Sequence, residues 1–183
     1  TSRAEYRLLL RQDNADMRLT PIGHEIGLID DERYDRFLLK KEQIEKEIER
    51  LKHVNIGANK TVQELLEGLG STKLNSGSTL EELIKRPELN YECLAPIDPD
   101  REPFDDDVIE QVNINIKYEG YIKRQLQQVE QFKKLEKKKL SLDFDYSQVP
   151  NLRKEAIQKL NEYQPASIGQ ASRISGVSPA DVS

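Results

Sequence analysis

The chain has little of what most active sites are built from: its 183 residues include no tryptophan, one cysteine and two histidines. The single cysteine, Cys93, excludes an internal disulfide and is typical of a reducing compartment, so we expect a cytoplasmic protein. The histidines, His24 and His53, lack the clustered ligands of a zinc site, so we expect no metal. No apolar run approaches the ~20 residues that cross a bilayer, so no membrane association is expected.

Catalytic motifs are also missing. The sequence contains no glycine-rich dinucleotide fingerprint, no P-loop and no strained nucleophile elbow. We therefore predict that this chain alone has no catalytic residue and binds neither flavin nor nucleotide, because it lacks the turn that brings backbone amides to a pyrophosphate. The chain begins without methionine and stops within what reads as a new helix, so we expect it to be part of a longer protein.

What the sequence does have is charge and helical periodicity. Charged residues make up 33% and hydrophobic residues 36% of the chain, and apolar positions recur every three or four residues. This pattern predicts an all-α fold with almost no strand. Long helices are predicted at 31–52 and 105–140. We expect them to pack as two long antiparallel helices, with short accessory helices forming a lid.

The second long helix has an apolar stripe that could pack antiparallel against Tyr34 to Leu51 of the first. The stripe consists of Val108, Val112, Ile116, Ile122, Leu126, Val129, Phe132 and Leu135. The helix begins with aspartates and ends with Lys137, Lys138 and Lys139, which suits the helix dipole.

Short, tightly capped helices follow and predict a small C-terminal helical module. Residues 141–150 read as a hinge, and 151–183 are expected to move as a unit. The domain boundaries are accordingly 1–147 and 148–183, the second being truncated at its end. The run ASRISGVSPADVS also resembles a DNA-reading helix-turn-helix, but its would-be recognition helix offers base edges no Arg, Lys or Asn. A sequence-specific DNA binder is therefore the weakest interpretation.

An arginine stripe opens the chain. Arg3, Arg7 and Arg11 are spaced by four residues and would share one face of a helix. Together with Arg18 they could form a phosphate-binding fork, because guanidinium groups pair bidentately with phosphate. The alternative is structural: the arginines pair with Glu5, Asp13 and Asp16 and hold a domain boundary together.

Cations and aromatics also meet around Gly120. Glycine in a helix costs ~1 kcal/mol relative to alanine, so its presence suggests close approach of RNA or a partner backbone. The neighbouring residues that could stack bases and hold phosphates are Lys117, Tyr118, Tyr121, Lys123 and Arg124. The alternative is that the two tyrosines cap the core.

Net charge divides the chain into three parts. Residues 1–20 carry +1, residues 21–116 carry −10 and residues 117–183 carry +4, which accounts for the total of −5. An acidic middle thus lies between two basic ends. An RNA-binding face is possible at those ends despite the acidic total.

Three blocks of the sequence resemble one protein family. They are TSRAEYRLLLRQDNADMRLTPIGHEIGLI at 1–29, YEGYIKRQ at 118–125 and LNEYQPASIGQASRISGVSPADVS at 160–183. In this order they are similar to the C-terminal region of the GidA (MnmG) family, the tRNA uridine 5-carboxymethylaminomethyl modification enzymes; residues 54–107 match loosely.

The resemblance implies a parent that binds FAD, uses NADH, forms a homodimer and modifies the wobble uridine of certain tRNAs together with the GTPase MnmE. The flavin-binding and redox parts of the family precede residue 1, so this chain would be a tRNA- and partner-docking region. A structural helical spacer that braces a dimer, without RNA contact, is the alternative. The candidate tRNA-binding residues are Arg3, Arg7, Arg11, Arg18, Lys123, Arg124 and Arg173. The candidate partner-binding residues are Ile168, Ile174 and Val177.

Overall fold

The computed structural model describes residues 6–182, so Arg3 and Glu5 lie outside the described residues. The predicted all-α fold is confirmed, and the long helices lie close to their predicted positions. The α-helices are α1 (Ala15–Glu25), α2 (Asp31–His53), α3 (Lys60–Gly68), α4 (Leu80–Ile84), α5 (Asp106–Lys137), α6 (Lys154–Tyr163) and α7 (Ile168–Ser172). Three 3-10 helices are η1 (Glu92–Ile97), η2 (Tyr146–Gln148) and η3 (Pro179–Asp181).

Strand structure in the described part of the chain is limited to one small antiparallel pair. Strand β1 (Asn55–Ile56) pairs with β2 (Ser78–Thr79), with Asn55 opposite Thr79. No helix within residues 6–182 is both long and apolar enough to cross a membrane.

The chain divides into two compact units, Thr1–Ile122 and Lys123–Ser183, and the division falls inside α5. We call them unit 1 and unit 2. The boundary expected after residue 147 lies within unit 2.

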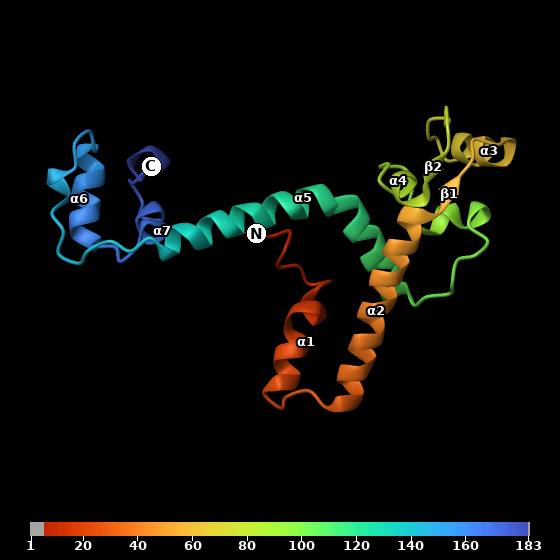
Figure 1. Cartoon of the computed structure of the whole chain (residues 1–183), viewed down its shortest axis with the longest axis horizontal. Helices are drawn as coiled ribbons and strands as arrows, with labels where there is room; N and C mark the ends of the chain where they lie inside the picture. Colours follow the sequence, from red (N-terminus) through yellow and green to blue (C-terminus); the bar gives the residue numbers. More distant parts are fainter. Residues whose placement is uncertain (1–5, 183) are drawn as a thin grey trace. The chain divides into compact units, whose positions relative to one another are not determined.

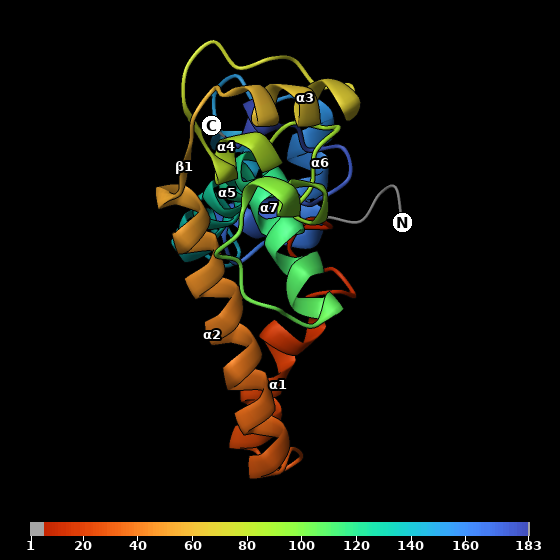
Figure 2. The same ribbon diagram turned by 90° about the vertical axis from the view of Figure 1, so that its right-hand side faces the viewer.

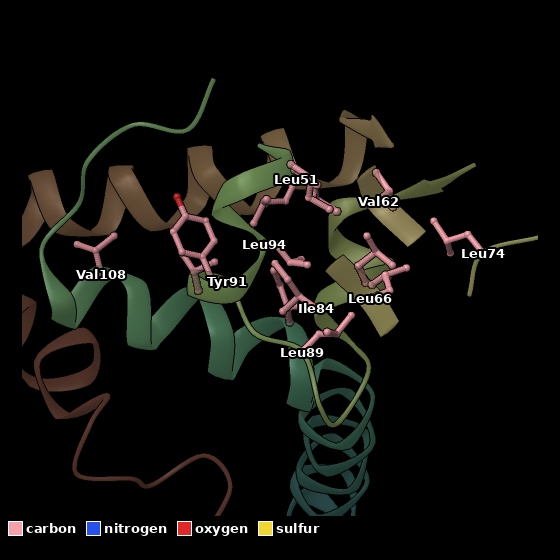
Figure 3. Packing of buried hydrophobic residues seen from close by; sticks show 14 of the residues in the cluster. Leu51, Val62, Leu66, Leu74, Ile84, Leu89, Tyr91, Leu94 and Val108 are labelled. Atoms are coloured by element: carbon pink, nitrogen blue, oxygen red, sulfur yellow. The ribbon is translucent and has the colours of Figure 1, made fainter. Parts of the chain in front are cut away.

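The core of unit 1 gathers buried side chains from α2, α3, α4, η1 and the first part of α5 (Figure 3). Leu51 of α2, Leu66 of α3 and Ile84 of α4 are at most 1% exposed. The short helices α3 and α4 are therefore part of the core rather than a lid over it. From α5 only Val108, Val112 and Ile116 enter, so the expected stripe contributes to this core through its first third.

Helix α1 lies alongside the first half of α2, and both views show the two side by side (Figures 1 and 2). The ring of His24 stacks on Tyr34 at 4.0 Å between centroids. The turn between the helices uses Gly27 at φ 76°, where glycine has no steric penalty. Asp30 then caps α2, its carboxylate accepting from the Arg33 amide at 2.8 Å.

A buried ion network joins α2 to η1 of unit 1. Arg50 donates two hydrogen bonds to Glu47, at 2.7 and 2.8 Å, and two to Asp98, at 2.6 and 2.9 Å. The two carboxylate side chains are only 2% and 5% exposed. Hydrogen bonds with Glu47 and then Asp98 raise the pKa of Arg50 above its already high value, so its guanidinium stays charged.

Unit 2 has a smaller core of its own. The end of α5 is tied to the start of α7, because the Leu140 amide donates to Ala166 and the Ile168 amide donates to Lys138. The buried members are Tyr146, Leu160 and Ala171, against which Leu140, Leu152, Ile174, Val177 and Val182 pack.

The segment expected to be a hinge, residues 141–150, packs within unit 2 in this structure. Tyr146 is 5% exposed, and its amide donates to the Asn161 side chain at 2.9 Å. The segment is thus fixed to α6 within unit 2. Of its alternating apolar residues only Tyr146 is buried, whereas Leu142 and Phe144 remain exposed.

Candidate nucleic-acid interface

The arginine stripe of the N-terminal segment is not a helical face. Residues 6–14 form turns, and α1 begins only at Ala15. The reason is local and lies in the side chain of Asn14. Its Nδ2 donates to Leu9 O at 3.0 Å, and its Oδ1 accepts from the Arg11 backbone N–H at 3.2 Å. Such side chain–backbone bonds compete with helix formation. Arg7 and Arg11 therefore do not stack one above the other.

Arg11 has a structural partner. Its Nε and Nη2 donate to the Asp13 carboxylate at 3.0–3.1 Å, and Gln111 of α5 donates to the same carboxylate at 2.9 Å. Burial alone would raise the pKa of Asp13, but the hydrogen bonds from Arg11 and Gln111 outweigh it and lower the pKa. The Arg11 side chain is 18% exposed. It fastens the N-terminal segment to α5 within unit 1.

The other N-terminal arginines differ from one another. Arg18 donates to the Asn14 side chain at 3.1 Å and to Arg11 O at 3.0 Å, so it also holds the turn. Arg7 is exposed and has no partner among the described residues. Asp16 pairs with Lys40 at 2.9 Å instead of with an arginine.

The residues around Gly120 separate into two groups. The Lys117 ammonium donates to Arg86 O at 2.9 Å and to Leu89 O, which satisfies backbone carbonyls of unit 1. Tyr118 and Tyr121 are 46% and 56% exposed, so they do not cap the core. A Cβ at Gly120 would meet nothing within 4 Å, so no described segment approaches it closely.

Lys123 and Arg124, at the start of unit 2, are exposed as the RNA hypothesis requires. Further cations follow, of which the sequence analysis had treated Lys137, Lys138 and Lys139 only as partners of the helix dipole. We call Lys134, Lys137, Lys138 and Lys139 the lysine cluster. All four are exposed, and none forms an ion pair with a described residue.

The acids near the lysine cluster are already engaged. Glu130 pairs with Lys133 at 2.9 Å, and Glu136 pairs with Arg173. Glu136 also accepts from the Ser167 hydroxyl at 2.9 Å, and hydrogen bonds from Arg173 and Ser167 lower the pKa of its carboxyl. Arg173 is thus half-exposed but neutralised. The sequence does contain a signal that could have identified the lysine cluster: between residues 123 and 139 there are seven cations and only two acids.

The expected partner-binding residues fall at the edge of the unit 2 core. Ile174 and Val177 are half-buried and pack against it. Ile168 lines an open hollow of about 480 Å³, which we call the unit 2 hollow. Its walls include Leu140, Phe144, Val149, Leu152, Val182 and Lys139.

Neither histidine belongs to a ligand cluster. His24 hydrogen-bonds Asp31 at 2.8 Å, and His53 hydrogen-bonds Glu49 at 2.9 Å. Within residues 6–182 no group of three or more His, Cys, Asp and Glu side chains could hold a metal ion.

Comparison with known families gives two matches that together cover most of the chain. Residues 31–126 match the family described as the tRNA modifying enzyme MnmG/GidA C-terminal helical domain. Residues 128–183 match the C-terminal helical bundle of the same enzymes.

Individual proteins agree with this. The whole chain is 65% identical to the tRNA uridine 5-carboxymethylaminomethyl modification enzyme MnmG of Lachnoclostridium phytofermentans and 61% identical to that of Clostridium novyi. It spans 29% of the length of each. The structure of Aquifex aeolicus GidA in its form II crystal is similar over 98% of this chain and 28% of that one, with 34% identity and a TM-score of 0.68.

Proposed function

The chain belongs to the MnmG/GidA family of tRNA-modifying enzymes, and we propose that it is the region of such an enzyme that docks tRNA and a partner protein. The observation that carries the proposal is the state of the cations in unit 2. A phosphate contact needs a cation that is exposed and not already neutralised by an acid. Lys123 and the lysine cluster meet both conditions among the described residues.

The charge of the two units supports the same assignment. Lys123–Ser183 contains eleven Lys and Arg against seven Asp and Glu, a net charge of +4, whereas Thr1–Ile122 carries −9. Polyanionic RNA is attracted to the positively charged unit 2 and repelled by the negatively charged unit 1. RNA contact is therefore proposed for unit 2, while the candidate arginines Arg11 and Arg18 act in the fold of unit 1.

The activity proposed for the whole protein is the one that its relatives' names describe, modification of a tRNA uridine. We propose that the parent binds FAD, uses NADH, works in the cytoplasm as a homodimer and acts on the wobble uridine with the GTPase MnmE. The reacting groups would lie in the remaining two thirds or more of such a protein, since this chain spans 29% of its relatives.

Partner docking is proposed for the apolar side of unit 2. Of the three candidate residues, Ile168 is the one in the wall of an open hollow. Ile174 and Val177 support that wall from the core.

A structural spacer is the second candidate function, and a specific observation favours it for unit 1. The Arg11–Asp13–Gln111 contacts and the Arg50 network join segments far apart in the sequence, as a bracing domain requires. The two functions can coexist, one in each unit.

The test is tRNA binding by this chain, followed by fluorescence anisotropy between 50 and 300 mM salt. We expect binding that weakens with salt, with a slope of ~0.7–0.9 per phosphate contact. Replacing Lys123 and Arg124 together by alanine should flatten that slope without loss of helix, because alanine favours helix. Absence of any salt-dependent binding would leave the structural spacer as the function of both units.

A further inference from the structure

We propose that the unit 2 hollow binds an amphipathic helix of a partner protein, one whose apolar stripe is flanked by glutamates or aspartates. This inference rests on the proposed docking function and specifies the chemistry of the partner. Its basis is the combination of an open apolar hollow with unneutralised lysines at one side of it.

The hollow has the size and lining of a binding site. A volume of about 480 Å³ falls within the ~300–1,000 Å³ range of protein binding pockets. Phe144 and Val149 belong to its wall and remain 38% and 36% exposed, and Leu142 nearby in the sequence is 70% exposed. Covering such apolar side chains with a partner's apolar surface is favourable, because it removes that surface from water.

The charges at the hollow select an acidic occupant. Asp181 lies in the wall, but Arg153 donates to its carboxylate through both Nε and Nη2, at distances from 2.5 to 3.1 Å. That carboxylate is therefore compensated. Lys139 also lies in the wall and has no ion pair with a described residue, and the rest of the lysine cluster precedes it at the end of α5. The uncompensated charge at the hollow is positive.

A helix fits these features better than an RNA base does. Recognition of an unstacked base uses hydrogen bonds to its edges as well as stacking. The Tyr146 hydroxyl in the hollow wall is buried and has no hydrogen-bond partner among the described groups, so it lies beneath the accessible surface. Apolar anchors at helical spacing, by contrast, need only an apolar groove, and flanking acids can reach the lysines.

The experiment uses three fluorescein-labelled 16-residue helical peptides and the whole chain. The first has a leucine stripe with glutamates on both flanks. The second keeps the leucines and has lysines on the flanks; the third keeps the glutamates and has serines in place of the leucines. We expect the first to bind at least tenfold more tightly than the second, and the third to show no binding at millimolar protein.

Protein variants locate the site. Phe144→Ser and Val149→Ser should each weaken binding of the glutamate peptide at least fivefold, because both residues lie in the wall of the hollow. The matched control is Leu126→Ser, which alters a side chain that is 49% exposed on α5 and absent from the hollow wall. It should bind as the unaltered chain does. The Lys138→Ala/Lys139→Ala variant should lose most of the discrimination between the glutamate and lysine peptides.

Two results would overturn the proposal: equal affinity for the glutamate and lysine peptides, or hollow variants that bind the glutamate peptide normally. A single-stranded RNA oligonucleotide that perturbs the NMR signals of Phe144 and Val149 when the peptides do not would assign the hollow to RNA instead. The same variants are assayed with tRNA. Loss of peptide binding with intact tRNA binding rejects only the docking helix, whereas absence of salt-dependent tRNA binding rejects the RNA function.

Discussion

Lys40 in unit 1 and Lys137 in unit 2 have the same side chain and opposite surroundings. Lys40 is 18% exposed and contacts Asp16 at 2.9 Å and Asp107 at 2.7 Å. Burial alone would lower its pKa, but the hydrogen bonds with Asp107 and Asp16 outweigh burial and raise the pKa. Lys137 is exposed and has no ion pair with a described residue.

The contrast extends beyond this pair. In unit 1, Arg50 also uses its charge to join distant segments, and Arg11 compensates the Asp13 carboxylate to which Gln111 of α5 donates. The unit as a whole is acidic. In unit 2, the lysine cluster is left to solvent on a basic unit. Lys40 and Arg50 of unit 1 thus serve the fold, whereas the lysine cluster of unit 2 is available to a ligand, and this difference can be tested residue by residue.

The largest effect is expected at Arg50. Replacing Arg50 by alanine leaves Glu47 and Asp98 buried without a counter-charge, so unit 1 should lose ~3–5 kcal/mol of unfolding free energy. Urea unfolding measures the loss. Arg36→Ala on the same helix is the control: its pair with Glu32 is exposed and 3.9 Å long, so it should cost less than ~0.5 kcal/mol. Similar losses for both variants would contradict the buried network.

A smaller effect is expected at Arg11. Arg11→Ala removes the hydrogen bonds to Asp13 and should cost ~1 kcal/mol of stability. It should leave tRNA affinity unchanged, because the guanidinium is occupied within unit 1. Arg7→Ala, at an exposed arginine, is the stability control and should change urea unfolding little. If Arg11→Ala instead lowered tRNA affinity and left stability unchanged, Arg11 would be a tRNA-binding residue rather than a structural one.

The smallest effect is a pH dependence in unit 2. Hydrogen bonds from Arg153 and then Ser178 hold the pKa of Asp181 well below its usual range. A depressed carboxyl pKa contributes stability above the unfolded pKa of ~3.9, and that contribution is lost as the pH falls toward the folded value. Asp181→Asn should therefore lower the thermal midpoint of unit 2 at pH 6, and the difference should shrink below pH 3.

The control for that measurement is Asp143→Asn, which changes an exposed carboxylate with no ion pair among the described residues. It should show no difference that disappears on acidification. A pH-independent difference for Asp181→Asn would mean that its hydrogen bonds to the backbone, and not its charge, hold the turn.

Local patterns in the sequence were enough to predict α2 and α5. Their periodicity runs over many residues, and Asp30 caps α2 as side-chain chemistry favours. The N-terminal segment was harder, because the Asn14 side chain binds Leu9 O and stops the helix that the arginine spacing suggested. A spacing of four residues places side chains on one face only if the backbone is helical.

The functional residues could be predicted only in part. Lys123 and Arg124 were predicted as candidates because Tyr118 and Tyr121 lie just before them in the sequence, and both cations are exposed in the structure. Lys137, Lys138 and Lys139 were attributed to the helix dipole, since no sequence pattern tells whether a lysine will have an acidic partner. The burial of Glu47 could not be predicted either, because the sequence around it is that of an exposed charged helix. Arg50 compensates its charge, together with that of the distant Asp98.

The most direct test of the contrast between the units is the salt dependence of tRNA binding for the variant with all four residues of the lysine cluster replaced by alanine. If each lysine contacts one phosphate, the slope of log affinity against log salt should fall by about 3, at ~0.7–0.9 per contact. The urea unfolding curve should stay the same, because none of the four side chains pairs within the described chain. An unchanged slope in a folded variant would contradict the account and show that RNA contact does not depend on these lysines.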